Sequence, residues 1–197
     1  MNRYKQTLLR GVVLLLIVPM MAAAQDIEER VIEHTLDNGL KLLMMERHTA
    51  PIIAPYIIFK SGSVDETSDS RGIAHMLEHM LFKGTKTIGT KDYEAEKVVL
   101  DEIDQIGDAL DAERAKGARA DKEKVAQLED ALKAKQEEHK QWIVRGEYEA
   151  IYSRHGSAGF NAGTSNDYTI YTVELPSNKL ELWAMLESDR LKNHVLR

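Results

Sequence analysis

Residues 72–85 read GIAHMLEHMLFKGT, and the interpretation of the whole chain starts from this stretch. In a helix, side chains three and four residues apart lie on one side, so His75, Glu78 and His79 form a single stripe. Phe82 continues the stripe by one more turn. The other positions are apolar, which predicts a helix that is buried on most of its sides: Ile73, Met76, Leu77, Met80 and Leu81.

Two imidazoles one helical turn apart can hold a single metal ion. Neutral imidazole nitrogens suit zinc, and a carboxylate directly before the second histidine can take a proton from a water at the metal. The order H-x-x-E-H is the reverse of the commoner H-E-x-x-H motif and is typical of the inverted group of zinc peptidases. The alternative is a surface helix with two solvated histidines. It is disfavoured here because a buried stripe of His75, Glu78 and His79 would be costly without a cation.

Beyond this helix, the chain resembles the pitrilysin family of zinc peptidases, which includes insulin-degrading enzyme and the mitochondrial processing peptidases. The stretches that carry the resemblance are Leu36–Lys41, Gly62–Glu66, Gly72–Thr85, and Phe160–Ser165 with Thr169 and Tyr171. The resemblance implies that His75 and His79 are ligands of one zinc ion. It also implies that Glu78 is the general base that activates water.

Members of this family hold their substrate as an added strand at a sheet edge beside the zinc, a mode in which backbone hydrogen bonds provide affinity. By the resemblance, Asn161, Ala162 and Gly163 are the expected substrate-binding positions. Small residues there would let another backbone come close. Without the resemblance, residues 161–165 would be interpreted as a hairpin with ordinary turn chemistry.

A catalytic zinc site has three protein ligands and one open position. The resemblance places the third ligand, a glutamate, beyond Arg197, and Glu187 is the alternative within the chain. We therefore expect residues 25–197 to be the N-terminal part of a C-terminally truncated peptidase domain, which would work with a second homologous half or subunit. The expected function is zinc-dependent endoproteolysis of peptides or unfolded segments, and the sequence leaves open whether this fragment is active alone. The alternative is a non-catalytic peptide-binding or partner subunit of a two-part peptidase.

The composition and net charge of the chain exclude some classes of protein. The chain has 197 residues, 43% of them hydrophobic and 29% charged, as in ordinary globular proteins. Its formal net charge of −6 argues against a nucleic-acid partner, and the absence of cysteine excludes disulfides and thiolate metal sites.

The N-terminus predicts export. Three basic residues precede an apolar run at residues 11–21 and three alanines at residues 22–24. This pattern is typical of a signal peptide spanning residues 1–24. Its removal would take away three positive charges and change the net charge from −6 to −9. We expect a periplasmic protein without a stable membrane anchor, with secretion or an uncleaved signal anchor as the alternatives.

The remaining pattern predicts an α+β domain, a layered sheet with helices packed on one face. Strands are expected at residues 31–36, 40–46, 56–60, 158–164 and 168–175. The metal helix is expected at residues 71–83, with Asp69 or Ser70 as its cap and Gly84 just past its end. A closing helix would be capped by Ser177 or Asn178. Its apolar face would be formed by Leu180, Trp183, Leu186 and Leu191.

A proline-free segment at about residues 91–153 predicts an inserted helical hairpin. Residues 92–113 carry nine acids and one lysine, whereas residues 114–140 carry eight basic and six acidic residues. Two such arms would partly neutralise each other in an antiparallel pair. Apolar residues recur at seam spacing along both arms: Leu100, Ile103, Leu110, Val125, Leu128 and Leu132. The alternative is two charged helices that project separately into solvent.

Overall fold

The computed structural model describes residues 27–197, so the predicted signal peptide at residues 1–24 lies outside the described part. The chain divides at Pro51 into two units, which are described separately. None of the helices within residues 27–197 is both long and apolar enough to cross a membrane.

The first unit contains a β-hairpin. Strands β1 (Ile32–Thr35) and β2 (Lys41–Met44) pair antiparallel, as predicted from the Asp-Asn-Gly sequence between them. Gly39 adopts a positive φ of 84°, which glycine adopts without steric cost. The Asn38 side chain accepts a hydrogen bond from the Leu40 amide and stabilises the turn.

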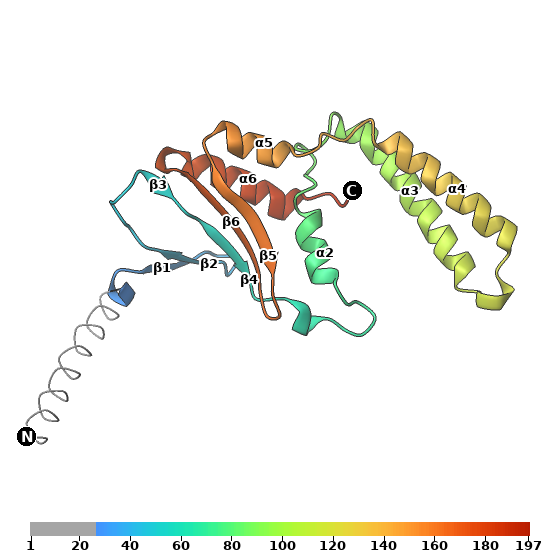
Figure 1. The fold of residues 1–197 in the computed structure, drawn as a ribbon, viewed down its shortest axis with the longest axis horizontal. Coiled ribbons are helices and arrows are strands. Elements are labelled where there is room, and N and C mark those ends of the chain that lie inside the picture. The colour runs from blue at the N-terminus through green and yellow to red at the C-terminus, as the bar shows by residue number, and fades with distance from the viewer. Residues whose placement is uncertain (1–26) are drawn as a thin grey trace, which may run out of the picture. The chain divides into compact units, whose positions relative to one another are not determined.

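The second unit is built on a small antiparallel sheet (Figure 1). Its longest strand, β6 (Thr169–Pro176), pairs with β5 (Ala158–Thr164) along one side. Along its other side it pairs with β4 (Tyr56–Phe59) and β3 (Ile52–Ile53). Pro55 lies between these two short strands and has no N–H for the ladder. Among the strands described, β5 is therefore an edge strand.

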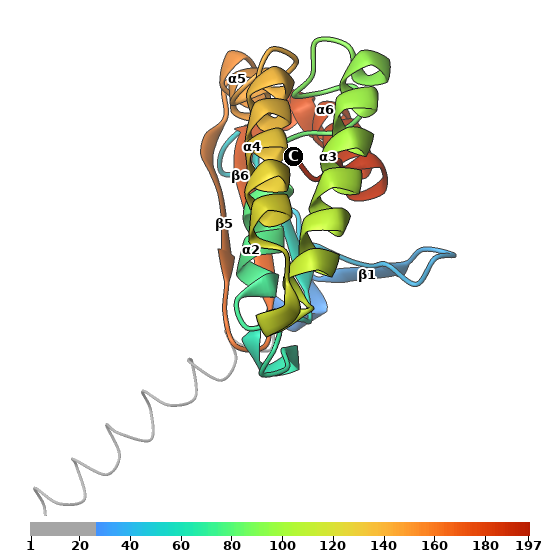
Figure 2. The same cartoon turned by 90° about the vertical axis from the view of Figure 1, so that its right-hand side faces the viewer.

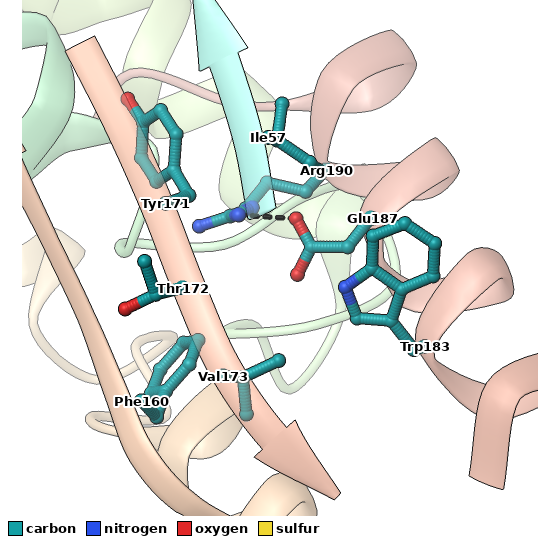
Figure 3. Close-up of a pocket in the computed structure, with 8 residues that line it drawn as sticks. All are labelled: Ile57, Phe160, Tyr171, Thr172, Val173, Trp183, Glu187 and Arg190. Atoms are coloured by element: carbon teal, nitrogen blue, oxygen red, sulfur yellow. Dashed lines mark hydrogen bonds and ion pairs between the residues drawn. The ribbon is translucent and has the colours of Figure 1, made fainter. Parts of the chain in front are cut away.

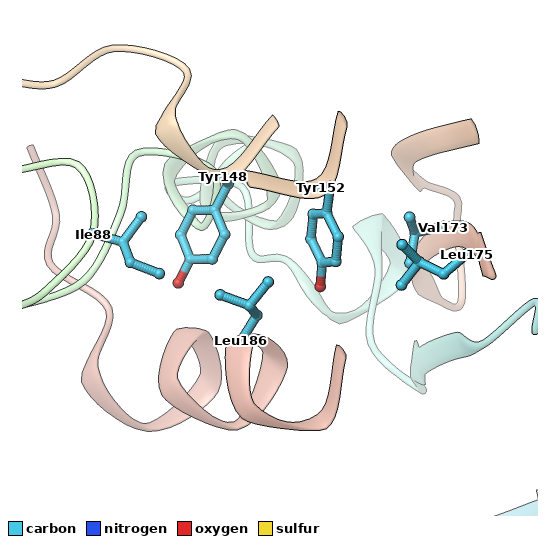
Figure 4. Close-up of a cluster of buried hydrophobic side chains, with 6 residues drawn as sticks. All are labelled: Ile88, Tyr148, Tyr152, Val173, Leu175 and Leu186. Atoms are coloured by element: carbon cyan, nitrogen blue, oxygen red, sulfur yellow. The ribbon is translucent and has the colours of Figure 1, made fainter. Parts of the chain in front are cut away.

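Helices cover one face of this sheet, as the sequence predicted. Along β6, alternate side chains are buried beneath α5 (Glu147–Arg154) and α6 (Leu180–Asn193). Figure 4 shows the resulting core, which is formed by Ile88, Tyr148, Tyr152, Val173, Leu175 and Leu186. On the opposite face, Tyr56 and Ile58 of β4 remain 60% and 58% exposed. The second unit thus confirms the predicted α+β fold class.

Helices α3 (Tyr93–Arg114) and α4 (Lys122–His139) form the predicted hairpin. They lie side by side in both Figure 1 and Figure 2. All six apolar seam residues are buried or half-buried. Ion pairs join the two arms: Arg114 with Glu129 at 2.6 Å, and Lys135 with Glu102 at 2.5 Å. The arms therefore pack against each other and do not project separately. The pair ends at His139, and α5, which lies within the predicted segment 91–153, joins the sheet core.

The predicted cap and apolar face of α6 were wrong in part. A short 3₁₀ turn precedes the helix, and neither Ser177 nor Asn178 makes a capping side-chain hydrogen bond. Leu180 and Leu191 are 53% and 38% exposed. The buried side of α6 is formed by Leu186 together with Glu187 and Arg190, whose ion pair is described below. Leu180 and Leu191 lie near the two ends of the helix, beyond this buried part.

Candidate metal and peptide site

The H-x-x-E-H motif lies on helix α2 (Ile73–Met80), and a residue that the sequence did not indicate caps the start of this helix. Glu66 accepts hydrogen bonds from the amides of Gly72, at 2.7 Å, and Ala74, at 2.9 Å. These two bonds lower the pKa of the Glu66 carboxyl below its ordinary value. The predicted caps were wrong, because the side chains of Asp69 and Ser70 bond only to the neighbouring loop residues Ser68 and Thr67.

The two histidines of the motif come together on one side of α2. The Nε2 atoms of His75 and His79 lie 3.1 Å apart, and both side chains are exposed. Two nitrogens bound to one tetrahedral zinc at its usual distance are separated by about 3.3 Å. The spacing of the pair therefore fits a shared zinc ion with little adjustment of either ring.

Glu78 points toward the sheet. It is the one buried residue of α2, with 6% of its surface exposed. Its Oε2 atom accepts a hydrogen bond of 2.7 Å from the hydroxyl of Thr164, the last residue of β5. Thr164 was not among the site residues predicted from the sequence. Strand alternation offered a signal, because Thr164 lies on the same face of β5 as Ala162.

The prediction that α2 is buried on most sides was wrong. Ile73, Met76 and Leu77 are 59%, 63% and 46% exposed. This helix has only eight residues and packs on β5 and β6 along one side, which leaves its apolar stripe uncovered within residues 52–197. The histidines are exposed as well, so the cost of burying them no longer argues for a metal. Their 3.1 Å spacing carries that argument instead.

Gly84 does not end α2 as predicted. The helix ends at Met80, and Leu81 follows with an ordinary right-handed conformation. Gly84 has a φ of 129°, and a Cβ atom on it would lie 2.1 Å from the carbonyl oxygen of Ile88. Glycine is therefore required at this position by a close approach of the backbone.

Aromatic rings and a buried ion pair lie between the end of α2 and the sheet. Phe82, just beyond α2, packs edge-on against Phe160 of β5 and tilted against Tyr171 of β6. The guanidinium of Arg190 lies over the Tyr171 ring, 4.5 Å from its centre, and forms an ion pair with Glu187 (Figure 3). Burial raises the pKa of Tyr171 to about 12; the charge on Arg190 opposes this rise, and the charge on Glu78 adds to it.

The in-chain alternative for the third zinc ligand is engaged elsewhere. The Glu187 carboxylate pairs with Arg190 and accepts a 2.6 Å hydrogen bond from the hydroxyl of Tyr152. Both partners are buried, as is Glu187 itself. Within residues 27–197, no three acidic, histidine or cysteine side chains gather in a way that could hold a metal ion.

The predicted substrate positions lie on the edge strand β5, which packs against α2. Asn161, Ala162 and Gly163 pair with residues of β6 on one side. On their other side, no strand of the described chain pairs with them. The Asn161 side chain is exposed, whereas Ala162 and Gly163 are half-buried. An open strand edge thus lies beside the helix that carries the histidines.

Comparisons with known proteins agree with this arrangement. Residues 41–116 match the model of the insulinase peptidases, peptidase family M16. The matched part of the chain is related to the M16 zinc peptidases. It includes His75, Glu78 and His79 but ends before β5, so the assignment of Asn161, Ala162 and Gly163 stays a prediction.

Individual relatives support the same family. The probable zinc protease PqqL of Escherichia coli is 36% identical over 69 residues, which are 34% of this chain and 7% of PqqL. The beta subunit of the mitochondrial processing peptidase of Dictyostelium discoideum is 36% identical over 78 residues, which are 40% of this chain and 15% of that protein. The chain therefore spans only a small part of the length of these relatives.

A solved structure supports the fold. The crystal structure of a protease from Helicobacter pylori superimposes with a TM-score of 0.53 over 85% of this chain and 27% of that chain, with 23% sequence identity. The predicted resemblance in sequence and fold is confirmed by these comparisons.

Proposed function

We propose that this chain is part of a zinc metallopeptidase that cleaves peptides or unfolded segments. The observation that carries the proposal is the 3.1 Å spacing of the His75 and His79 nitrogens, within a segment that matches the M16 family. His75 and His79 would hold one zinc ion through Nε2. When bound, zinc would polarise the scissile carbonyl and lower the pKa of an attacking water.

Glu78 would act as the general base. A carboxylate that takes a proton from water and passes it to the leaving amine needs one oxygen free to face the substrate. Thr164 donates to Oε2 of Glu78, and no donor within residues 27–197 bonds to Oε1. Thr164 would therefore hold the carboxylate in one orientation and leave its second oxygen for proton transfer.

The edge of β5 would bind the substrate by strand addition. The unpaired backbone groups of residues 161–163 offer hydrogen bonds to an extended peptide. Because β5 packs against α2 and Thr164 bonds to Glu78, a peptide on this edge would pass close to the general base. The exposed Asn161 side chain would contact the added strand directly.

The complete enzyme would need more than the described residues. Two histidines leave the zinc site one protein ligand short, so we place the third ligand beyond Arg197 or on a partner. A second homologous half or subunit would complete the substrate chamber, in line with the two-part organisation expected from the resemblance. The signal-like residues 1–24 support export, most simply to the periplasm.

A zinc titration followed by calorimetry tests the metal site. We expect the wild-type chain to bind one zinc ion and both His75→Ala and His79→Ala to weaken binding at least a hundredfold. His155→Ala is the matched control, because this half-buried histidine of the same unit lies outside the motif. Zinc binding that survives both motif substitutions would overturn the proposal.

A second candidate is a non-catalytic peptide-binding or partner subunit. It is favoured by one observation, that no group of three metal-binding side chains forms within residues 27–197. Both candidates predict peptide binding at β5. Hydrolysis of an unstructured peptide separates them when the zinc-loaded chain is tested as part of the complete two-part protein: turnover supports the peptidase, and peptide binding without turnover supports the subunit.

A further inference from the structure

The loop that leads into α2 is docked on the turn between β5 and β6. The Ser63 amide donates a hydrogen bond of 3.1 Å to the carbonyl of Ser165. The next amide, that of Val64, donates one of 2.8 Å to the carbonyl of Asn166. A Cβ atom on Gly62 would lie 2.3 Å from the Ser165 carbonyl oxygen, so this approach needs glycine. The loop and the strand turn therefore hold each other in one arrangement.

Glu66 extends this docked loop to the start of α2. Each of its two carboxylate oxygens accepts one backbone N–H, from Gly72 and from Ala74. The first amides of a helix have no partners within it, and a negative charge at this end is favourable. Gly72, the residue at the cap position, has no side chain to supply such a bond. Glu66 thus does the work of a helix cap from six residues upstream.

We propose that Glu66 is a positioning residue for the His75–His79 pair, an inference that rests on the zinc site proposed above. His75 directly follows Ala74, whose amide Glu66 holds, and so lies in the first turn of a helix of only two turns. Loss of the cap would let this turn fray and would release His75 from its spacing to His79. The docked loop also fixes the start of α2 relative to β5, and Thr164 of β5 fixes Glu78.

Zinc and cobalt titrations of the full chain test this role. We expect Glu66→Ala to weaken zinc binding about tenfold, the factor by which loss of a helix cap shifts a helix–coil equilibrium. Its cobalt complex should show altered d–d bands, which report the geometry of the ligands. Glu66→Gln keeps one acceptor oxygen and should recover part of the affinity. Amide exchange of Gly72 and Ala74, followed by NMR in metal-free protein, should accelerate in Glu66→Ala.

Asp121→Ala is the matched control. Asp121 caps α4 by accepting hydrogen bonds from the amides of Glu123 and Lys124. Asp121→Ala therefore removes a similar cap from a helix that does not carry the histidine pair. It should lower global stability comparably without changing zinc affinity. Equal zinc binding by Glu66→Ala and wild type would overturn the inference alone. A wild-type chain that binds no zinc would overturn the proposed function, and the inference with it.

Discussion

The helical hairpin and helix α2 each contain a buried carboxylate, and the two carboxylates have different kinds of hydrogen-bond partner. In the hairpin, Glu96 is fully buried and lies between the His139 ring, at 2.7 Å, and the guanidinium of Arg197, at 2.6 Å. On α2, Glu78 is almost as deeply buried, yet its hydrogen-bond partner is the neutral hydroxyl of Thr164. Within the described residues, Glu78 forms no ion pair.

This difference separates structural carboxylates from one that is available for chemistry. Burial alone would raise the pKa of Glu96, but the hydrogen bonds from Arg197 and His139 outweigh it and hold that pKa below its ordinary value. The Glu96 carboxylate is therefore committed to its ion pair with Arg197. Glu78 lacks such a cation and keeps the freedom that a general base requires. Unlike Glu78, its neighbours on α2, His75 and His79, are exposed, so that a ligand can reach them.

The largest expected effect concerns Glu78, the carboxylate that is available for chemistry. In the complete zinc-loaded enzyme, Glu78→Gln should lower peptide hydrolysis about 10²- to 10⁴-fold, because an amide cannot take the proton. Zinc affinity and the urea midpoint should stay close to those of wild type, since the amide still accepts the bond from Thr164. Unchanged hydrolysis by the variant would remove Glu78 from the role of base.

The next largest effect concerns Glu96, the structural carboxylate, and is measured as a loss of stability. Glu96→Ala should destabilise the protein by about 3–5 kcal/mol, because it leaves the buried cation of Arg197 without its partner. Urea unfolding followed by circular dichroism measures this change. The control is Glu102→Ala on the same helix, whose partly exposed pair with Lys135 should contribute less than about 1 kcal/mol. Equal losses from both variants would contradict the distinction drawn here.

A smaller effect is expected for the hydrogen bond between Thr164 and Glu78. Thr164→Val removes the hydroxyl that holds Glu78 but keeps the shape of the side chain. We expect kcat to fall about tenfold with KM nearly unchanged, in line with a lost hydrogen bond of about 1.5 kcal/mol to a charged group. Thr164→Ser restores the hydroxyl and should recover most of the rate. A fall in zinc affinity without a change in kcat would instead assign Thr164 to the metal site.

The smallest expected effect lies at the tip of the hairpin, in its dependence on pH. The amide of Asp121 and the ammonium groups of Lys116 and Lys124 lower the pKa of Glu113 to about 2. Because this pKa is lower in the folded state, its stabilising contribution is present above the unfolded value of 4.5. It is lost as the pH falls from there toward 2. Urea midpoints between pH 2 and 7 should therefore decline less steeply in Glu113→Gln. Identical slopes in the two proteins would contradict the assignment.

Some features followed from the sequence because they depend on local spacing. The turn at Gly39, the hairpin of β5 and β6, and the seam of the α3–α4 hairpin each rest on contacts between residues close in the chain or on one helical face. The His75–His79 spacing belongs to this group, since residues four apart on a helix are neighbours whatever surrounds them. The burial of α2 does not belong to it, and that prediction was wrong.

Other features were decided only by tertiary structure. The cap of α2 comes from Glu66, and the partner of Glu78 comes from Thr164, which is 86 residues away. Neither pairing has a period that a helical wheel or strand pattern can show. They exist because the sheet brings the β5–β6 turn against the loop before α2. The sequence by itself determined which groups can bind a metal and move a proton, whereas the fold decided how these groups are oriented and which neighbours hold them.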